Sequence, residues 1–131
     1  MQEIRVRTHC RAELIDITDE VARAVSSAGL REGWVTVFVT HTTAGITINE
    51  NADPDVGADI LAALEQIVPR RGSYRHGEGN ADSHVKASLM GSSVTVPVAA
   101  GKLTFGAWQG IYLCEFDGPR TRRVVVQTVA G

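Results

Sequence analysis

The sequence predicts one α+β domain over residues 1–131, with a mixed, mostly antiparallel β-sheet and about three helices. Several segments alternate apolar and polar residues, as half-buried strands do, and only a few show helical spacing. Strand-like segments also follow one another through short turns, which favours hairpins over alternating β–α–β units. The length of 131 residues and the hydrophobic content of 44% suit a single globular domain.

The first part of the chain predicts strands on either side of a short helix. Ile4 and Val6 alternate with charged residues, which is the period of a half-buried strand. A helix is expected to begin at Thr18, a frequent capping residue followed by two acidic residues, and to end at Gly29. Residues 34–40 are all Val, Thr, Phe or Trp, a composition typical of a strand.

A second strand and a second helix follow. Ile46 and Ile48 resume the strand alternation. Asp53 is expected to cap a helix whose first residue is Pro54, and Pro69 ends this helix. The predicted buried stripe of the helix consists of Val56, Ile60, Ala63, Leu64 and Ile67.

The rest of the chain predicts a loop, a short third helix and further strands. Residues 70–81 are rich in glycine and polar groups and are expected to form the loop. Asp82 is expected to cap the helix, which would carry Val85 and Leu89 inward and end at Gly91. The predicted strands that follow are 94–98, 111–116 and 123–129, the last two joined by a turn over 117–120.

Composition narrows the kinds of partner and the compartment. A net charge of -2 predicts no general attraction to nucleic acid or to an anionic membrane. No segment has the roughly 20 apolar residues of a membrane helix, and the first residues lack the apolar core of a signal peptide. Cys10 and Cys114 are too few for a disulfide scaffold, and both are expected to be buried thiols in strands. These features predict a cytoplasmic protein.

The most unusual segment is 76–84, in which a ligand-capable side chain stands at every second position. These side chains belong to His76, Glu78, Asn80, Asp82 and His84. If the backbone is extended here, all of them project to the same side. Histidines and carboxylates together suit a divalent metal such as Zn or Mg, although the spacing matches no standard zinc signature. A solvated glycine-rich loop is the alternative interpretation.

His84 also stands near the expected start of the third helix. Free N–H groups at a helix start bind phosphate, and Lys86 in the following turn adds positive charge, as Arg120 does elsewhere in the chain. A neutral imidazole at this position would bind a metal or act as a general base. The alternative role of His84 is a structural hydrogen bond to a loop carbonyl.

Further candidates lie at the ends of predicted strands. His41 follows the strand over 34–40, where rigid backbone often positions functional groups, although a structural role is the more frequent one for a single histidine. Asn49 and Glu50 add polar groups just before the second helix. Trp108 would be either a core residue or a flat surface on which a heteroaromatic ring stacks.

Three blocks of the sequence resemble the YjbQ/UPF0047 family, in order and in spacing, across essentially the whole chain. The first block combines HTTAG at 41–45 with NENADP at 49–54. The second is EGNADSHVKASL at 78–89. The third combines GAWQGIY at 106–112 with EFDGPR at 115–120. Several long blocks in the same order are far more specific than any single motif.

The resemblance implies a compact α+β fold, a homotrimer, and a site shared by residues of the motif blocks. In that site the expected catalytic residues are His84, Asp82 and Glu78. The expected substrate-binding residues are Asn49, Glu50, Asn80, Lys86, Trp108 and Arg120. The expected metal ligands are His41, His76 and His84, of which His76 lies at the edge of its block. We further expect His41, His84 and Trp108 to line one pocket.

The YjbQ/UPF0047 family is often named for a secondary thiamine-phosphate synthase activity, so the resemblance implies this activity as a secondary function. This reaction joins a pyrimidine diphosphate to a thiazole phosphate and expels pyrophosphate. Such chemistry requires charge neutralisation at the leaving group, commonly by a metal and basic residues. The predicted ligand is therefore a phosphorylated or heterocyclic small molecule. The alternative is a homotrimer that binds a small molecule or a metal without catalysis.

Overall fold

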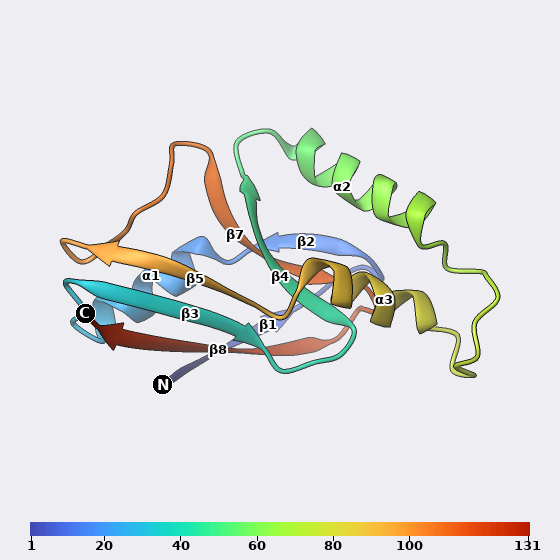
Figure 1. Ribbon diagram of the computed structural model, residues 1–131, viewed down its shortest axis with the longest axis horizontal. Helices are drawn as coiled ribbons and strands as arrows, with labels where there is room; N and C mark the ends of the chain where they lie inside the picture. Colours follow the sequence, from blue (N-terminus) through green and yellow to red (C-terminus); the bar gives the residue numbers. More distant parts are fainter.

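The computed structural model describes residues 1–131 and contains eight strands and three helices. Along the chain these are β1 (Gln2–Arg7), β2 (Glu13–Asp16), α1 (Thr18–Ser27), β3 (Gly33–Val39), β4 (Ala44–Glu50), α2 (Pro54–Ile67), α3 (Ala81–Met90), β5 (Ser93–Ala99), β6 (Lys102–Leu103), β7 (Gln109–Glu115) and β8 (Thr121–Ala130). Figure 1 shows α1 at one end of the molecule and α2 with α3 at the other. The predicted fold class is confirmed.

The strands form two sheets, in which every pairing is antiparallel. The larger sheet has the order β1-β8-β3-β5-β6, and the smaller has the order β2-β7-β4. The register of the smaller sheet opposes Ala44 to Glu115 at one end of β4 and Glu50 to Gln109 at the other. Residues just before β4, such as His41, therefore lie at one end of this pair of strands, and residues just before β7, such as Trp108, lie at the other end.

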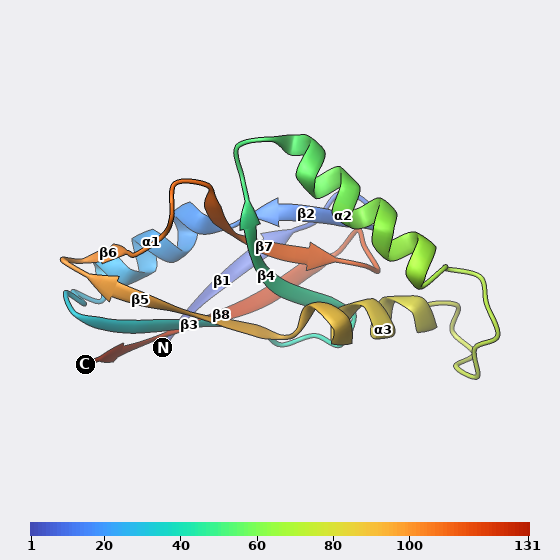
Figure 2. The ribbon, with the colours of Figure 1, turned by 45° about the horizontal axis from the view of Figure 1, so that its top comes forward.

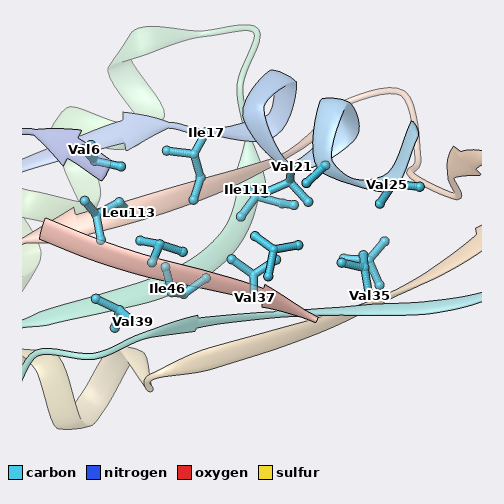
Figure 3. Close-up of a cluster of buried hydrophobic side chains, with 14 of the residues drawn as sticks. Val6, Ile17, Val21, Val25, Val35, Val37, Val39, Ile46, Ile111 and Leu113 are labelled. Carbon is cyan, nitrogen blue, oxygen red and sulfur yellow. The ribbon is translucent and has the colours of Figure 1, made fainter. Parts of the chain in front are cut away.

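The main core fills the space between the two sheets and α1. Valines of β3 face Ile46 of β4 and Ile111 and Leu113 of β7, and α1 adds Val21 and Val25, as Figure 3 shows. Val35, Val37 and Val39 are fully buried, as their alternation with polar or exposed residues predicts. A second, smaller cluster under α2 and α3 consists of Leu64, Ala87, Cys114 and Phe116.

The start of α2 follows the sequence signals closely. Asp53 accepts a hydrogen bond from the backbone N–H of Asp55 (2.9 Å) and so caps α2, whose first residue is Pro54. The predicted buried stripe is confirmed only in part. Leu64 is buried and Val56 and Ile60 are half-buried, whereas Ala63 is exposed and Ile67 is 70% exposed. Figure 2 shows α2 running along the outside of the molecule, near β2 and α3.

The inward face of α3 is polar rather than apolar, which contradicts the sequence prediction. Val85 and Leu89 are exposed, whereas Asp82, Ser83 and Lys86 are buried. The N-cap position is Asn80, and no side chain caps the helix, so Asp82 does not have the predicted capping role. Its carboxylate instead points into the protein, where it accepts hydrogen bonds from Arg11 and Lys86.

The two cysteines differ in their surroundings. Cys114 lies in β7 and is buried, as expected, and burial raises the pKa of its thiol to about 12. Cys10 was predicted to be buried in a strand, but it is exposed in the segment between β1 and β2. None of the helices has the length and apolar character that crossing a membrane requires.

Candidate functional site

Two hollows meet at His84, on the side of α3 that faces the beginning of β4. The first, which we call the histidine hollow, has a volume of about 530 Å³ and is lined by His41, Thr42, Ala44, His84, Ala87, Ser88, Gly91 and Ser92. The second, which we call the loop hollow, has a volume of about 380 Å³ and is lined by Tyr74, Arg75, His76, Ala81 and His84. The structure therefore brings His41 and His84 to one pocket.

His41 is held in place by the backbone of β8. Its Nε2 accepts a hydrogen bond of 2.8 Å from the backbone N–H of Arg123. This contact assigns the proton of the neutral ring to Nδ1. Partial burial, followed by the charge of Arg122, lowers the pKa of His41 below its ordinary value, and Glu115 opposes part of this effect. His41 is therefore a neutral N–H donor at neutral pH.

A buried ion pair between Arg122 and Glu115 lies next to His41 and positions β8, the strand whose backbone bonds to His41. Arg122 donates from Nε to both carboxylate oxygens of Glu115, at 2.9 and 3.0 Å. Its terminal Nη2 donates to Glu115 and to Oγ1 of Thr43 (2.9 Å). Thr8 donates to Glu115 at 2.7 Å. Neither charged side chain is more than 1% exposed. The pair thus positions the segment of β8 that bonds to His41.

His84 is close to His76 rather than to an acidic residue. The two rings stand edge to face, with their centroids 5.2 Å apart. Glu78 lies in an exposed turn, with its carboxylate 3.8 Å from Nε2 of His76. The segment 76–84 is not extended, because it turns and then enters α3 at Ala81. Its alternate side chains consequently point in different directions.

Asp82 faces away from the histidine hollow and joins a network of charged side chains. One oxygen accepts from Arg11 (3.1 Å), and the other accepts from Nζ of Lys86 (2.9 Å). Lys86 also donates to Glu65 at 2.8 Å. Burial opposes the charge of Lys86, but its hydrogen bonds to Glu65 and then Asp82 raise the pKa of Lys86 above its ordinary value. Within one chain, Lys86 therefore does not line the hollow that His41 lines.

Asp117 gathers two of the predicted substrate-binding residues. Its Oδ2 accepts hydrogen bonds from Nδ2 of Asn80 (2.8 Å) and from Arg120 (3.1 Å), and its Oδ1 lies 3.5 Å from Arg11. The other side-chain atom of Asn80, Oδ1, is buried without a hydrogen-bond partner. Asp117 belongs to the turn before β8, where sequence reasoning saw only a turn former.

Trp108, Asn49 and Glu50 lie elsewhere. Trp108 precedes β7 and is 63% exposed, and its carbonyl accepts from the backbone N–H of Asn51. Asn49 and Glu50 occupy the same end of β4, opposite to the end next to His41. The seven residues of β4 span about 20 Å. Within one chain, the single pocket predicted for His41, His84 and Trp108 does not form.

The predicted metal ligands do not converge on one point within the chain. His41 lines only the histidine hollow and His76 only the loop hollow, and the Nε2 lone pair of His41 is already engaged. No group of three or more His, Cys, Asp or Glu side chains is arranged to hold a metal ion. These residues alone therefore do not fit a site with three protein ligands.

Sequence reasoning missed several residues at these hollows. Thr42, Ser88 and Ser92 line the histidine hollow with hydroxyl groups, and Arg75 supplies a cation to the loop hollow. The spacing of His84 and Ser88, four residues apart on one helix, places both on one face and could have identified Ser88. Nothing in the sequence pattern pairs Arg11 with α3, because this contact spans 71 residues.

The fold and the position of these hollows define a small α+β protein with an open polar site where α3 meets β4. A family profile described as "UPF0047 protein YjbQ-like" matches residues 2–131. The chain belongs to this family. The UPF0047 protein YugU of Bacillus subtilis is 46% identical over 128 residues, which cover 97% of this chain and 97% of that protein.

Solved structures of relatives share the fold. A protein of the YjbQ/UPF0047 family from Clostridium acetobutylicum has a TM-score of 0.97 and 52% identity, covering 98% of this chain and all of its own. A YjbQ-like protein of unknown function from Sulfolobus solfataricus has a TM-score of 0.95 and 36% identity, covering 99% of this chain and 96% of its own. The likeness therefore extends over the whole domain.

Proposed function

We propose that the chain is a small-molecule enzyme that joins two substrates across His84, with thiamine-phosphate synthase activity as a secondary function. The observation that carries this proposal is the position of His84, which lines both the histidine hollow and the loop hollow. An enzyme that unites two molecules accelerates the reaction by holding both in adjoining sites. One hollow for each substrate meets that requirement.

The loop hollow suits the diphosphate of the pyrimidine substrate. Arg75 and His76 supply donors, and the N–H groups at the start of α3 add a positive dipole end at Ala81. In the reaction the thiazole ring nitrogen bonds to the methylene carbon of the pyrimidine while the carbon–oxygen bond to the diphosphate breaks. Pyrophosphate leaves with the electron pair. Hydrogen-bond donors in the loop hollow would stabilise the negative charge that develops on the departing pyrophosphate.

The histidine hollow suits the second substrate. Neutral His41 offers its Nδ1–H, and Thr42 and Ser92 offer hydroxyl donors, so the hollow provides hydrogen-bond donors without a buried charge. The hydroxyl of Ser88 already donates to the carbonyl of His84 and remains available as an acceptor. This set of donors would position a phosphate or a polar ring. A divalent metal in this scheme enters as Mg²⁺ bound to the diphosphate, since Mg²⁺ commonly binds substrate phosphates with few protein ligands.

Turnover of the two thiamine precursors tests the proposal. Purified protein with Mg²⁺ should release pyrophosphate only when both substrates are present. We expect His84→Ala to lower this rate by about 100-fold or more, because the residue between the substrates is lost. His9→Ala is the matched control, because His9 is exposed and lines neither hollow. Full activity in His84→Ala, with a folded protein, would rule out the proposed role.

The alternative is a homotrimer that binds a small molecule or a metal without catalysis. Stoichiometric binding of either precursor with no release of pyrophosphate would favour this alternative over the enzyme. An apolar area on the outer face of the larger sheet supports self-association of the chain, and the family resemblance suggests three copies. Trp34 and Phe38 of β3 are each 42% exposed there, next to Val129 of β8, which is 36% exposed.

We expect light scattering to give about three times the chain mass of 14.0 kDa, if this outer face joins the subunits. Phe38→Glu should lower the mass to that of one chain, because it places a charge in the interface. Ile67→Glu is the matched control, since Ile67 is also exposed but lies at the end of α2. A trimer that survives Phe38→Glu and is lost in Ile67→Glu would place the interface elsewhere.

A further inference from the structure

A third hollow lies beneath α2 and α3, apart from both hollows at His84. It has a volume of about 240 Å³ and is lined by Arg11, Ala12, Leu61, Leu64, Glu65, Arg70, Lys86 and Phe116. None of these residues lines the histidine hollow or the loop hollow. α3 separates the sites, with His84 on one face and Lys86 on the other. We call this hollow the basic pocket.

The carboxylates of the basic pocket are already engaged. Glu65 accepts from the backbone N–H of Arg70 through one oxygen (3.1 Å) and from Lys86 through the other (2.8 Å). Asp82, behind the pocket, likewise uses one oxygen for Arg11 and the other for Lys86. Each oxygen atom of these two carboxylates therefore has a partner within the protein.

The cations of the pocket retain unused donors. Lys86 has three N–H groups, of which two have partners, and its side chain is only 8% exposed. The guanidinium of Arg70 has no protein partner, and Nε of Arg11 has none. The wall therefore retains free donors on positively charged groups, while each carboxylate oxygen already accepts one hydrogen bond. An anion satisfies such donors, whereas a cation or a neutral donor does not.

The remaining wall is apolar. Leu61 and Leu64 of α2 and Phe116, which follows β7, contribute hydrocarbon surface beside the basic groups. The volume is below the roughly 300–1,000 Å³ of pockets that hold drug-sized ligands, so the occupant must be small. We propose that the basic pocket is a second ligand site for a small organic anion, a carboxylate or a phosphate monoester that carries a short apolar group.

Four probes separate the two parts of this recognition. Benzoate and phenyl phosphate combine an anion with a ring, inorganic phosphate lacks the ring, and benzyl alcohol lacks the charge. By calorimetry we expect one or both of the first two to bind, and each of the last two to bind at least about tenfold more weakly. Whether benzoate or phenyl phosphate binds more tightly assigns the headgroup. Equal affinity for all four probes would overturn the proposal.

Arg70→Gln provides the decisive variant, because Arg70 is exposed and its loss leaves no buried carboxylate without a partner. We expect its affinity for the tighter probe to fall by about tenfold. Arg71→Gln is the matched control, since Arg71 does not line the pocket. Unchanged binding in Arg70→Gln would refute the site.

The same titration in His84→Asn keeps this inference distinct from the proposed function. We expect unchanged affinity for the probe, because His84 lies on the other face of α3. A loss of probe binding in His84→Asn but not in Arg70→Gln would place the probe in the hollows at His84 and overturn the basic pocket. Failure of the turnover assay alone would leave this result intact, since the probe binds without reacting.

Discussion

Replacing Arg122 by methionine is expected to lower the free energy of unfolding by about 3–5 kcal/mol, among the largest effects of any single substitution in this chain. Arg122 is 1% exposed and is the basic partner of Glu115, which is 0% exposed. Methionine fills much of the same space but leaves the carboxylate buried, with only Thr8 and the backbone N–H of Asp117 as donors. Urea denaturation monitored by circular dichroism measures the change.

Two controls separate the buried ion pair from general effects of charge. Arg23→Ala removes an exposed pair with Glu20 on α1 and should cost no more than about 1 kcal/mol. The double variant Glu115→Gln with Arg122→Met should be less destabilised than the sum of the single variants, because the unpaired charge is gone. Additive effects of the two substitutions would show that the pair contributes no coupling energy.

The sequence predicted the elements whose pattern follows from local chemistry. The run of Val, Thr, Phe and Trp over 34–40 identified β3, because β-branched and aromatic side chains pack well on a sheet. Asp53 and Pro54 identified the start of α2, because a capping side chain and a proline both act within the first turn. The arrangement of these strands into two sheets could not be derived in the same way, since the order of strands depends on contacts between distant residues.

α3 shows why the candidate site was predicted only in part. Its apolar residues suggested that Val85 and Leu89 point inward, since burial of apolar side chains is the usual source of helix stability. The structure turns Asp82 and Lys86 inward instead, because Arg11 and Glu65 supply the opposite charges from elsewhere in the chain. A buried charge is stable only with such partners, and a single sequence does not show which residues will provide them.

The two histidines illustrate the opposite outcome. His41 and His84 were each predicted as candidates from local context, and the structure places both at the histidine hollow. Trp108 and Glu50 were assigned to the same site, but the antiparallel register of β4 and β7 carries them to the far end of the strand. Membership of the same motif block therefore did not imply proximity, because a block that follows a strand spans the length of that strand.

Gly118→Ala is expected to destabilise the fold by about 1–3 kcal/mol, through overpacking at the junction that supports the ion pair. A methyl group at position 118 would overlap the carbonyl oxygen of Cys10 and would lie 2.8 Å from Oγ1 of Thr8 and 2.9 Å from Cγ of Glu115. The carbonyl oxygen of Cys10 belongs to the backbone, so it cannot move aside for the methyl group as the end of a flexible side chain could. The urea midpoint of unfolding measures the loss.

Gly77→Ala is the matched control for Gly118→Ala, because the same methyl group would meet no atom within 4 Å at position 77. It should leave stability unchanged or raise it slightly, since alanine restricts the unfolded chain. The overlap at position 118 also involves Thr8 and Glu115, which belong to the ion-pair network next to the segment of β8 that bonds to His41. We therefore expect the imidazole resonances of His41 to shift in Gly118→Ala and to stay in place in Gly77→Ala. Equal midpoints and unshifted resonances in both variants would mean that this junction can accommodate a side chain at position 118.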